Sequence, residues 1–203
     1  MRRKALWFLA VFLVVFLTAC SNGGASSRIP EKAGVSPCEL SETETQLLES
    51  FDMTNTAQLM GFRAPEDAVS MKINVYHLKD GAWQSAGQGE ISTGKGDGGD
   101  KALTGTIAMQ ILEDHRIKFT VHSSGNYTFI SDAILSETES QSSMTGFLQE
   151  FQSGELNTEI PVALMVHDAG TKMSPYSLAD YFDPTRFAEM DFVQVVTVEF
   201  SEK

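Results

Sequence analysis

Short segments in which apolar and polar residues alternate constrain the fold of this chain more than any other feature of its sequence. A period of two places successive side chains on opposite faces of a strand, so each such segment predicts a strand with one buried face. The alternation is clearest over residues 69–75, 103–111 and 117–121. The Asp80-Gly81 pair signals a turn after the first segment, and the polar stretch at 113–116 predicts that the other two form a hairpin.

Further strands are predicted by segments that are apolar throughout or rich in β-branched residues. Residues 127–130 follow a turn at 123–126, residues 162–166 are uniformly apolar, and residues 192–200 carry four valines. These segments make at least six strand candidates at short spacing, and no helical pattern alternates with them. The sequence therefore predicts an all-β fold, a single β-sandwich or jelly-roll-like domain, rather than a parallel α/β sheet.

Residues 40–51 fit two different structures. Ser41-Glu42-Thr43-Glu44 matches a helix capping box, and an apolar face would follow it along one side of a helix. Residues 45–53 fit a strand as well, and both alternatives stay open. Three loops are predicted elsewhere: a glycine-rich one at 87–101, a polar one at 136–143, and a long one at 174–191 that carries several aromatic residues.

The first twenty residues carry a separate signal. Arg2, Arg3 and Lys4 precede an uncharged run over residues 5–19, which ends in Leu17-Thr18-Ala19-Cys20. The run is shorter than the about 20 apolar residues of a membrane span. A basic start, a short apolar core and small residues before a cut site are typical of an export signal. The pattern resembles the bacterial lipobox, which implies that Cys20 is lipidated and becomes the new N-terminus.

Three parts follow from this resemblance and from composition: a signal peptide at 1–19, the lipidated Cys20 with a flexible tether to residue 38, and a sandwich domain at 39–203. Residues 21–38 are rich in Gly, Ser and Pro and lack periodicity, as expected of a tether. The membrane is then a partner through the lipid on Cys20, and the domain lies outside the cytoplasm on the cell membrane or outer membrane. Ser21, which is not Asp, implies outer-membrane sorting in a two-membrane bacterium.

The charge of the chain is strongly acidic. The full sequence has a net charge of −12, and removal of residues 1–19 leaves 12 of the 15 basic residues against all 27 acidic ones. Such a chain repels phosphate backbones, so nucleic acid is excluded as an expected partner. Only Cys20 and Cys38 are cysteines. If Cys20 is lipidated, Cys38 has no internal partner, and it is interpreted as an unpaired thiol rather than a catalytic one.

Several patterns match chemical motifs only in part, and no catalytic residue, cofactor or metal site is predicted from them. Residues 94–99 read G-x-G-x-x-G, but a strand is predicted next, so a hairpin loop fits better than a dinucleotide site. The pairs Asp97/Asp100 and Asp180/Asp183 offer fewer oxygens than the about six to eight that Ca²⁺ takes, and they are interpreted as solvated loops. The four histidines show no zinc-ligand spacing.

The aromatic residues near the 174–191 loop are the candidate ligand-binding feature. Tyr176, Tyr181 and Phe182, with Trp83 beside a predicted loop, could stack on sugar rings or anchor a protein partner. The alternative is that they cap one end of the core. The hypothesis for function is a cell-envelope lipoprotein with a non-catalytic binding domain for a surface glycan or envelope protein. The alternatives are a hydrolase of surface glycans or peptides and a structural component of an envelope complex.

Overall fold

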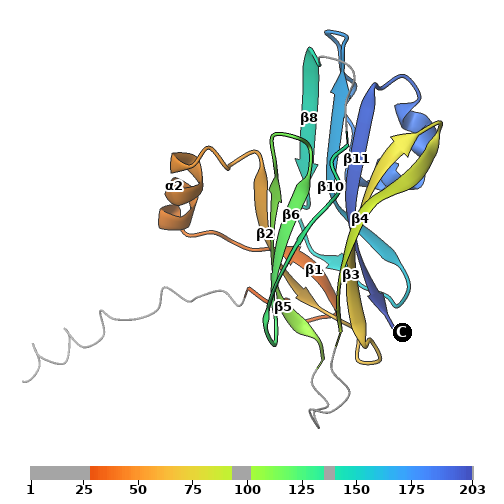
Figure 1. Cartoon of the computed structure of the whole chain (residues 1–203). Coiled ribbons are helices and arrows are strands. Elements are labelled where there is room, and N and C mark those ends of the chain that lie inside the picture. The colour runs from red at the N-terminus through yellow and green to blue at the C-terminus, as the bar shows by residue number, and fades with distance from the viewer. Residues whose placement is uncertain (1–27, 93–101, 135–139, 203) are drawn as a thin grey trace, which may run out of the picture.

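Two antiparallel β-sheets packed face to face form the protein (Figure 1). The computed structural model describes residues 28–92, 102–134 and 140–202. One sheet has six strands in the order β7-β6-β5-β2-β1-β9, and the other has five in the order β4-β3-β11-β10-β8. The prediction of an all-β sandwich is confirmed. The strands are β1 (Gly34–Pro37), β2 (Ala57–Arg63), β3 (Ser70–Lys79), β4 (Ala82–Ser92), β5 (Thr104–Ile111), β6 (Ile117–His122), β7 (Asn126–Ile130), β8 (Ser142–Phe147), β9 (Gln152–Ser153), β10 (Glu159–Asp168) and β11 (Phe192–Ser201).

The core lies between the two sheets and is built from the alternating positions of their strands. Phe62 of β2 and Phe200 of β11 are both fully buried, and their ring centroids lie 6.5 Å apart across the sandwich. Ile107 and Phe119 of the β5–β6 hairpin face the same interior. The predicted hairpin of these two strands is therefore confirmed, because its inward positions are those that the alternation identified.

The Asp80-Gly81 turn is confirmed as the connection between β3 and β4. Asp80 has φ of 52° and Gly81 has φ of 75°. Two successive residues with positive φ define the type I′ turn, whose twist matches that of the strands it joins.

The expected tether at residues 20–38 is wrong for its last part. Gly34–Pro37 forms β1, which pairs with β2 on one side and with β9 on the other. Val35 is fully buried in the core, so the folded domain begins before residue 39. A single buried valine between Gly34 and Pro37 makes no alternating pattern, so the sequence does not predict a strand here. Pairing with the distant strands β2 and β9 holds the segment in place.

Part of the predicted glycine-rich loop at 87–101 also belongs to a strand, since β4 continues to Ser92. A Cβ atom on Gly89 would lie 2.6 Å from the ring of Phe129, which packs over this position. The glycine is therefore a site of close packing between the two sheets rather than a turn residue. The G-x-G-x-x-G motif at 94–99 lies outside the described residues.

Residues 40–51, for which both a helix and a strand remained open, form the helix α2 (Glu42–Ser50). The predicted capping box is present: the Ser41 hydroxyl accepts a hydrogen bond from the Glu44 amide at 3.3 Å, and the Glu44 carboxylate accepts one from the Ser41 amide at 2.9 Å. The helix stands to one side of the six-stranded sheet (Figure 1). No helix in the part of the chain that the structure describes is long and apolar enough to cross a membrane.

Candidate functional site

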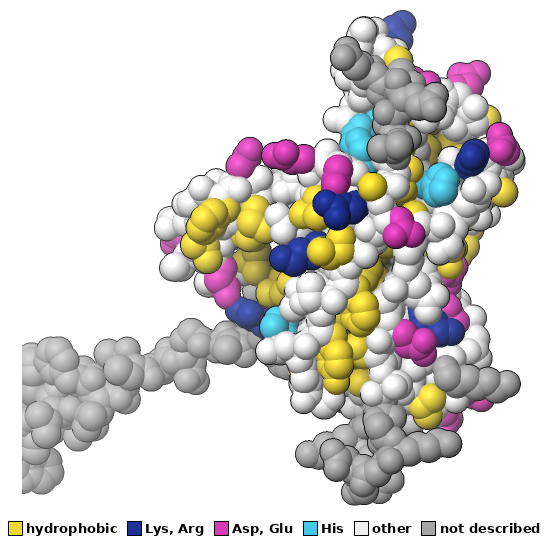
Figure 2. All heavy atoms as spheres, viewed as in Figure 1, with side chains coloured by type: hydrophobic (Ala, Val, Ile, Leu, Met, Phe, Trp, Pro, Cys, Tyr) yellow, Lys and Arg dark blue, Asp and Glu magenta, His cyan; other side chains and the backbone are white. Residues whose placement is uncertain are grey.

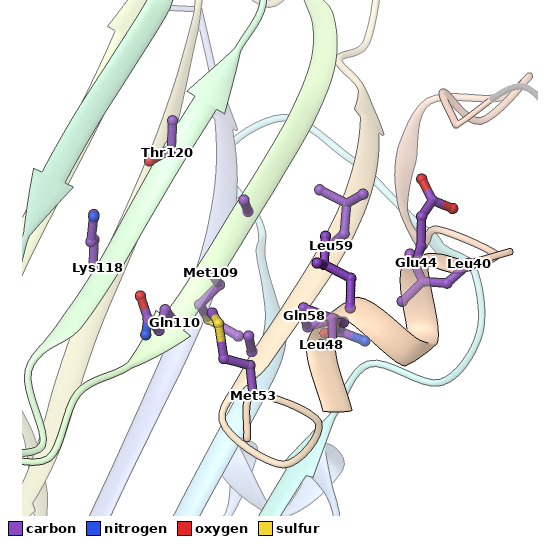
Figure 3. Close-up of a pocket in the computed structure, with 13 residues that line it drawn as sticks. Leu40, Glu44, Leu48, Met53, Gln58, Leu59, Met109, Gln110, Lys118 and Thr120 are labelled. Atoms are coloured by element: carbon purple, nitrogen blue, oxygen red, sulfur yellow. The ribbon is translucent and has the colours of Figure 1, made fainter. Parts of the chain in front are cut away.

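An apolar groove lies between α2 and the outer face of the six-stranded sheet (Figure 3). Its volume is about 300 Å³, the lower end of the range for ligand pockets. Its walls come from Leu40, from α2 and the loop after it, and from the strands β2, β5 and β6. The aliphatic lining residues are Leu40, Leu47, Leu48, Met53, Ala57, Leu59, Ala108 and Met109, and the polar ones are Glu44, Gln58, Gln110, Lys118 and Thr120.

The groove exists because α2 is not packed tightly against the sheet. None of its residues is buried, and Leu47 is 57% exposed. Opposite the helix, the outward positions of the sheet carry the small side chains of Ala57 and Ala108, which leave space beneath Leu48. Figure 2 shows hydrophobic side chains in a hollow on the side where α2 lies. Aliphatic surface of this kind is costly to leave in water, and for that reason we take the groove as the candidate site.

Three of the five polar residues of the groove lie at its edge on the β6 side. Lys118 and Thr120 of β6 lie beside Gln110 of β5 (Figure 3). Lys118 forms no ion pair with any residue in the described ranges. An aliphatic groove with one ammonium group at its edge suits an amphiphile, whose chain enters the groove and whose polar head stays at the rim.

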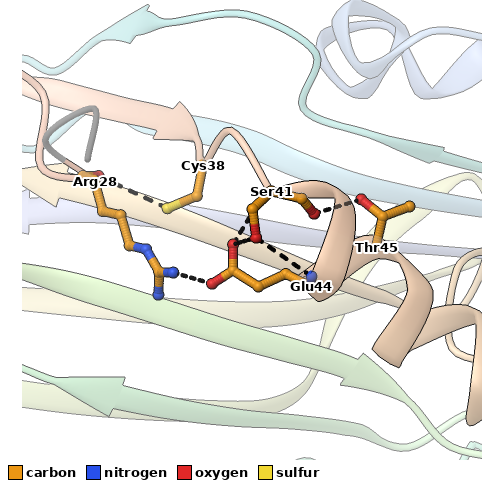
Figure 4. A network of polar contacts seen from close by, with 5 residues as sticks. All are labelled: Arg28, Cys38, Ser41, Glu44 and Thr45. Carbon is orange, nitrogen blue, oxygen red and sulfur yellow. Dashed lines mark hydrogen bonds and ion pairs between the residues drawn. The ribbon is translucent and has the colours of Figure 1, made fainter. Parts of the chain in front are cut away.

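The helix is held in its position by a polar network at its N-terminus (Figure 4). The Arg28 guanidinium pairs with the Glu44 carboxylate, which also accepts from Ser41. Hydrogen bonds from Ser41 and then the charge of Arg28 lower the pKa of Glu44. The Cys38 thiol lies 3.7 Å from the Arg28 carbonyl oxygen, and burial raises the pKa of this thiol. A raised pKa lowers the fraction of thiolate, which is the nucleophilic form of cysteine.

Three of the four aromatic residues singled out in the sequence pack together on the outer face of the five-stranded sheet. They surround the buried Phe187, which lies in the short 3₁₀ helix η2 (Pro184–Phe187). The ring centroids of Tyr176 and Trp83 lie 4.9 and 6.1 Å from that of Phe187. The Trp83 indole donates to the Tyr181 carbonyl at 2.9 Å. These rings form a covering layer for the sheet.

Phe182 is the fourth aromatic residue and lies differently. It ends the 3₁₀ helix η1 (Leu178–Phe182), and its side chain is 66% exposed. Its ring meets that of Tyr181 edge-on at 5.1 Å. Ligand binding by these four residues stays a prediction, and Phe182 is the member that a partner would reach first.

A polar cluster around Glu159 fastens the 3₁₀ segment to the sheet. One carboxylate oxygen accepts from the Tyr76 hydroxyl at 2.7 Å, the Asn74 amide at 2.9 Å and the Thr197 hydroxyl at 3.0 Å. The other accepts from the Tyr181 hydroxyl. Burial, followed by the hydrogen bond to Glu159, raises the pKa of both tyrosines. Since every member is bonded within the cluster, its role is to hold the covering layer in place.

Of the two aspartate pairs considered as Ca²⁺ ligands, the structure describes one, Asp180 and Asp183. Asp180 accepts from the Ser177 amide at 2.7 Å and lies 3.3 Å from Arg186, and Asp183 accepts from the Thr185 hydroxyl at 2.6 Å. Both therefore serve the local turns. Asp97 and Asp100 lie outside the described residues, as does Cys20. Within residues 28–92, 102–134 and 140–202, no three His, Cys, Asp or Glu side chains are grouped as metal ligands would be.

Comparison of the chain with protein-family models, with curated proteins and with solved structures finds no match. The groove was not predicted from the sequence, because its residues lie between positions 40 and 120 and come together only in the fold. The apolar face of the possible helix was the sequence feature that pointed toward it.

Proposed function

We propose that this chain is a cell-envelope lipoprotein, anchored through Cys20, whose β-sandwich is a non-catalytic domain that binds an acyl chain. The observation that carries the proposal is the groove between α2 and the six-stranded sheet. It exposes leucine, methionine and alanine side chains in a hollow of about 300 Å³. A lipobox-like signal at the N-terminus and an apolar groove in the domain both support a role close to acyl chains.

The lining of the groove favours an acyl chain over a sugar. Sugar rings are commonly held by stacking on aromatic side chains together with many hydrogen bonds. Eight of the 13 residues that line the groove are aliphatic, five are polar, and none of them is aromatic. Leu48 and Leu59 offer only dispersion contacts and removal of apolar area from water, which is what an acyl chain gains from a binding site. Lys118 at the rim matches the carboxylate or phosphate of an anionic amphiphile.

The experiment is a titration of the mature-length chain carrying Cys20→Ser with dansyl-labelled undecanoic acid, followed by dansyl fluorescence. The proposal predicts saturable binding that Ala108→Phe abolishes, because the larger side chain fills the groove. The matched control is Ala82→Phe, the same substitution at an exposed position of β4 on the other sheet. Far-UV circular dichroism of each variant verifies that the β structure is retained. Equal binding by the Ala108→Phe variant would contradict the proposal.

A second candidate is contact with a surface glycan or an envelope protein through Phe182. The observation that favours it is the exposed ring on a segment that the Glu159 cluster fixes in place. A rigidly supported aromatic side chain is the usual centre of a protein contact. Loss of binding in Phe182→Ala, on a glycan array or against a purified envelope partner, with an unchanged thermal midpoint would support this candidate.

A further inference from the structure

We infer that the acyl group in the groove is the one carried by Cys20 of the same molecule. This inference rests on the proposed function, because it requires both lipidation of Cys20 and an acyl-binding groove. It goes beyond that function by naming the source of the ligand.

The described chain begins at the groove. The Arg28 carbonyl lies over Gly61 of β2 so closely that a Cβ atom on this residue would be 1.6 Å from the carbonyl oxygen. Gly61 is thus the residue that lets the N-terminal segment rest on the outer face of the six-stranded sheet. The Arg63 side chain donates to the Pro30 carbonyl at 2.8 Å and holds the next residues of the segment on the same face.

Arg28 is also tied to the wall of the groove. Its guanidinium pairs with Glu44, which belongs to α2 and is itself one of the lining residues. The carbonyl of Arg28 faces the Cys38 thiol just before the helix (Figure 4). Arg28, the first residue that the structure describes, is therefore in contact with a residue of the groove.

Cys20 is close enough to Arg28 for its acyl group to reach this groove. Seven residues lie between them. A chain advances at most about 3.3–3.6 Å per residue, so the two Cα atoms are within about 29 Å of each other. A Gly/Ser-rich coil of this length has an average end-to-end distance of roughly 15 Å. Since Arg28 contacts the groove wall through Glu44, the acyl group on Cys20 can reach the groove without full extension of the chain between Cys20 and Arg28.

Attachment favours the protein's own acyl chain over a free one. A ligand joined by a short linker is present at an effective concentration of the order of millimolar. Free amphiphiles must lose translational freedom on binding, whereas the acyl chain on Cys20 has lost most of it already. A bilayer offers the same acyl chain an equivalent apolar environment, so the test is made in cells, where both are available.

The experiment uses photo-crosslinking from the lipid itself. Cells that express the full chain are fed a fatty acid with a diazirine on its alkyl chain, which enters lipoproteins by the ordinary acylation route. The cells are irradiated intact, and peptides of the purified protein are identified by mass spectrometry. The inference predicts crosslinks from the Cys20 peptide to the peptides that contain Leu48, Leu59 or Ala108, and their loss in Ala108→Phe but not in Ala82→Phe.

Two further arms separate the possible results. The mature-length Cys20→Ser chain is irradiated with the free diazirine fatty acid: labelled groove peptides support the proposed function, and unlabelled ones overturn it together with the inference. If this arm succeeds while the Cys20 peptide of the lipidated chain is crosslinked only to membrane lipid, the inference alone is overturned. Mixed expression of isotopically light and heavy chains identifies crosslinks between molecules, and a predominance of light–heavy pairs would assign the groove to a second copy.

Discussion

Replacement of Phe187 by alanine should destabilise the domain strongly. Phe187 is 1% exposed and lies between the rings of Trp83 and Tyr176 on the outer face of the five-stranded sheet. Truncation of a buried phenylalanine costs about 3–5 kcal/mol, since the lost transfer free energy adds to that of the cavity left behind. For a chain of this size, about 2–4 °C of thermal midpoint corresponds to each kcal/mol. The expected drop is therefore roughly 6–20 °C.

Phe182→Ala is the matched control for this prediction. It is the same substitution five residues earlier in the same segment, but the side chain is 66% exposed. A surface substitution of this kind changes stability by no more than about 0.5 kcal/mol, which is about 2 °C or less here. Thermal unfolding followed by circular dichroism compares the two. Similar midpoints for both variants would show that residues 174–191 do not cover the sheet, and the account of the aromatic layer would be refuted.

Three further perturbations test other parts of the structure. Val35→Asp should prevent folding, because it places an unpaired carboxylate in the core. Circular dichroism should show loss of the β signal, and a stably folded variant would mean that residues 34–37 are not part of the folded domain. The pKa values of Tyr76 and Tyr181 are raised in the folded protein, so the stabilisation linked to these two groups should be complete below about pH 10 and be lost as the pH rises above it, because unfolded tyrosines ionise near pH 10. Urea unfolding should show a smaller loss of stability at high pH for Tyr181→Phe. Burial and then the charge of His115 lower the pKa of His167, so stability should fall as the pH drops below about 6.5, and urea midpoints for His167→Gln should show a smaller fall.

The sequence predicted the parts of the fold whose signal is local. Ile117, Phe119 and Val121 alternate with polar residues, and the strand that contains them has the expected inward face. Residues 162–166 are buried throughout, as their uniform apolarity indicated. The capping box at Ser41 was likewise visible, since both of its hydrogen bonds join residues three positions apart.

The parts that were missed depend on contacts between distant residues. Strand β1 is fixed by β2 and β9, and the second half of β4 has glycines where the other sheet approaches closely. Neither feature produces a periodic pattern. The groove was not predictable for the same reason: Leu48 and Ala108 line it together only because β2 and β5 are neighbours and α2 stands beside them. For the aromatic residues, composition identified the segment but could not distinguish the packed Tyr181 from the exposed Phe182.

The central claim is that the groove between α2 and the six-stranded sheet holds an acyl chain. The most direct measurement is a crystal structure of the mature-length Cys20→Ser chain with a fatty acid brominated at the end of its alkyl chain, in which anomalous scattering locates the bromine. The account predicts one bromine position between Leu48 and Ala108, with the carboxylate near Lys118. A bromine position beneath residues 174–191, or a groove without ligand at a saturating concentration of the fatty acid, would contradict it.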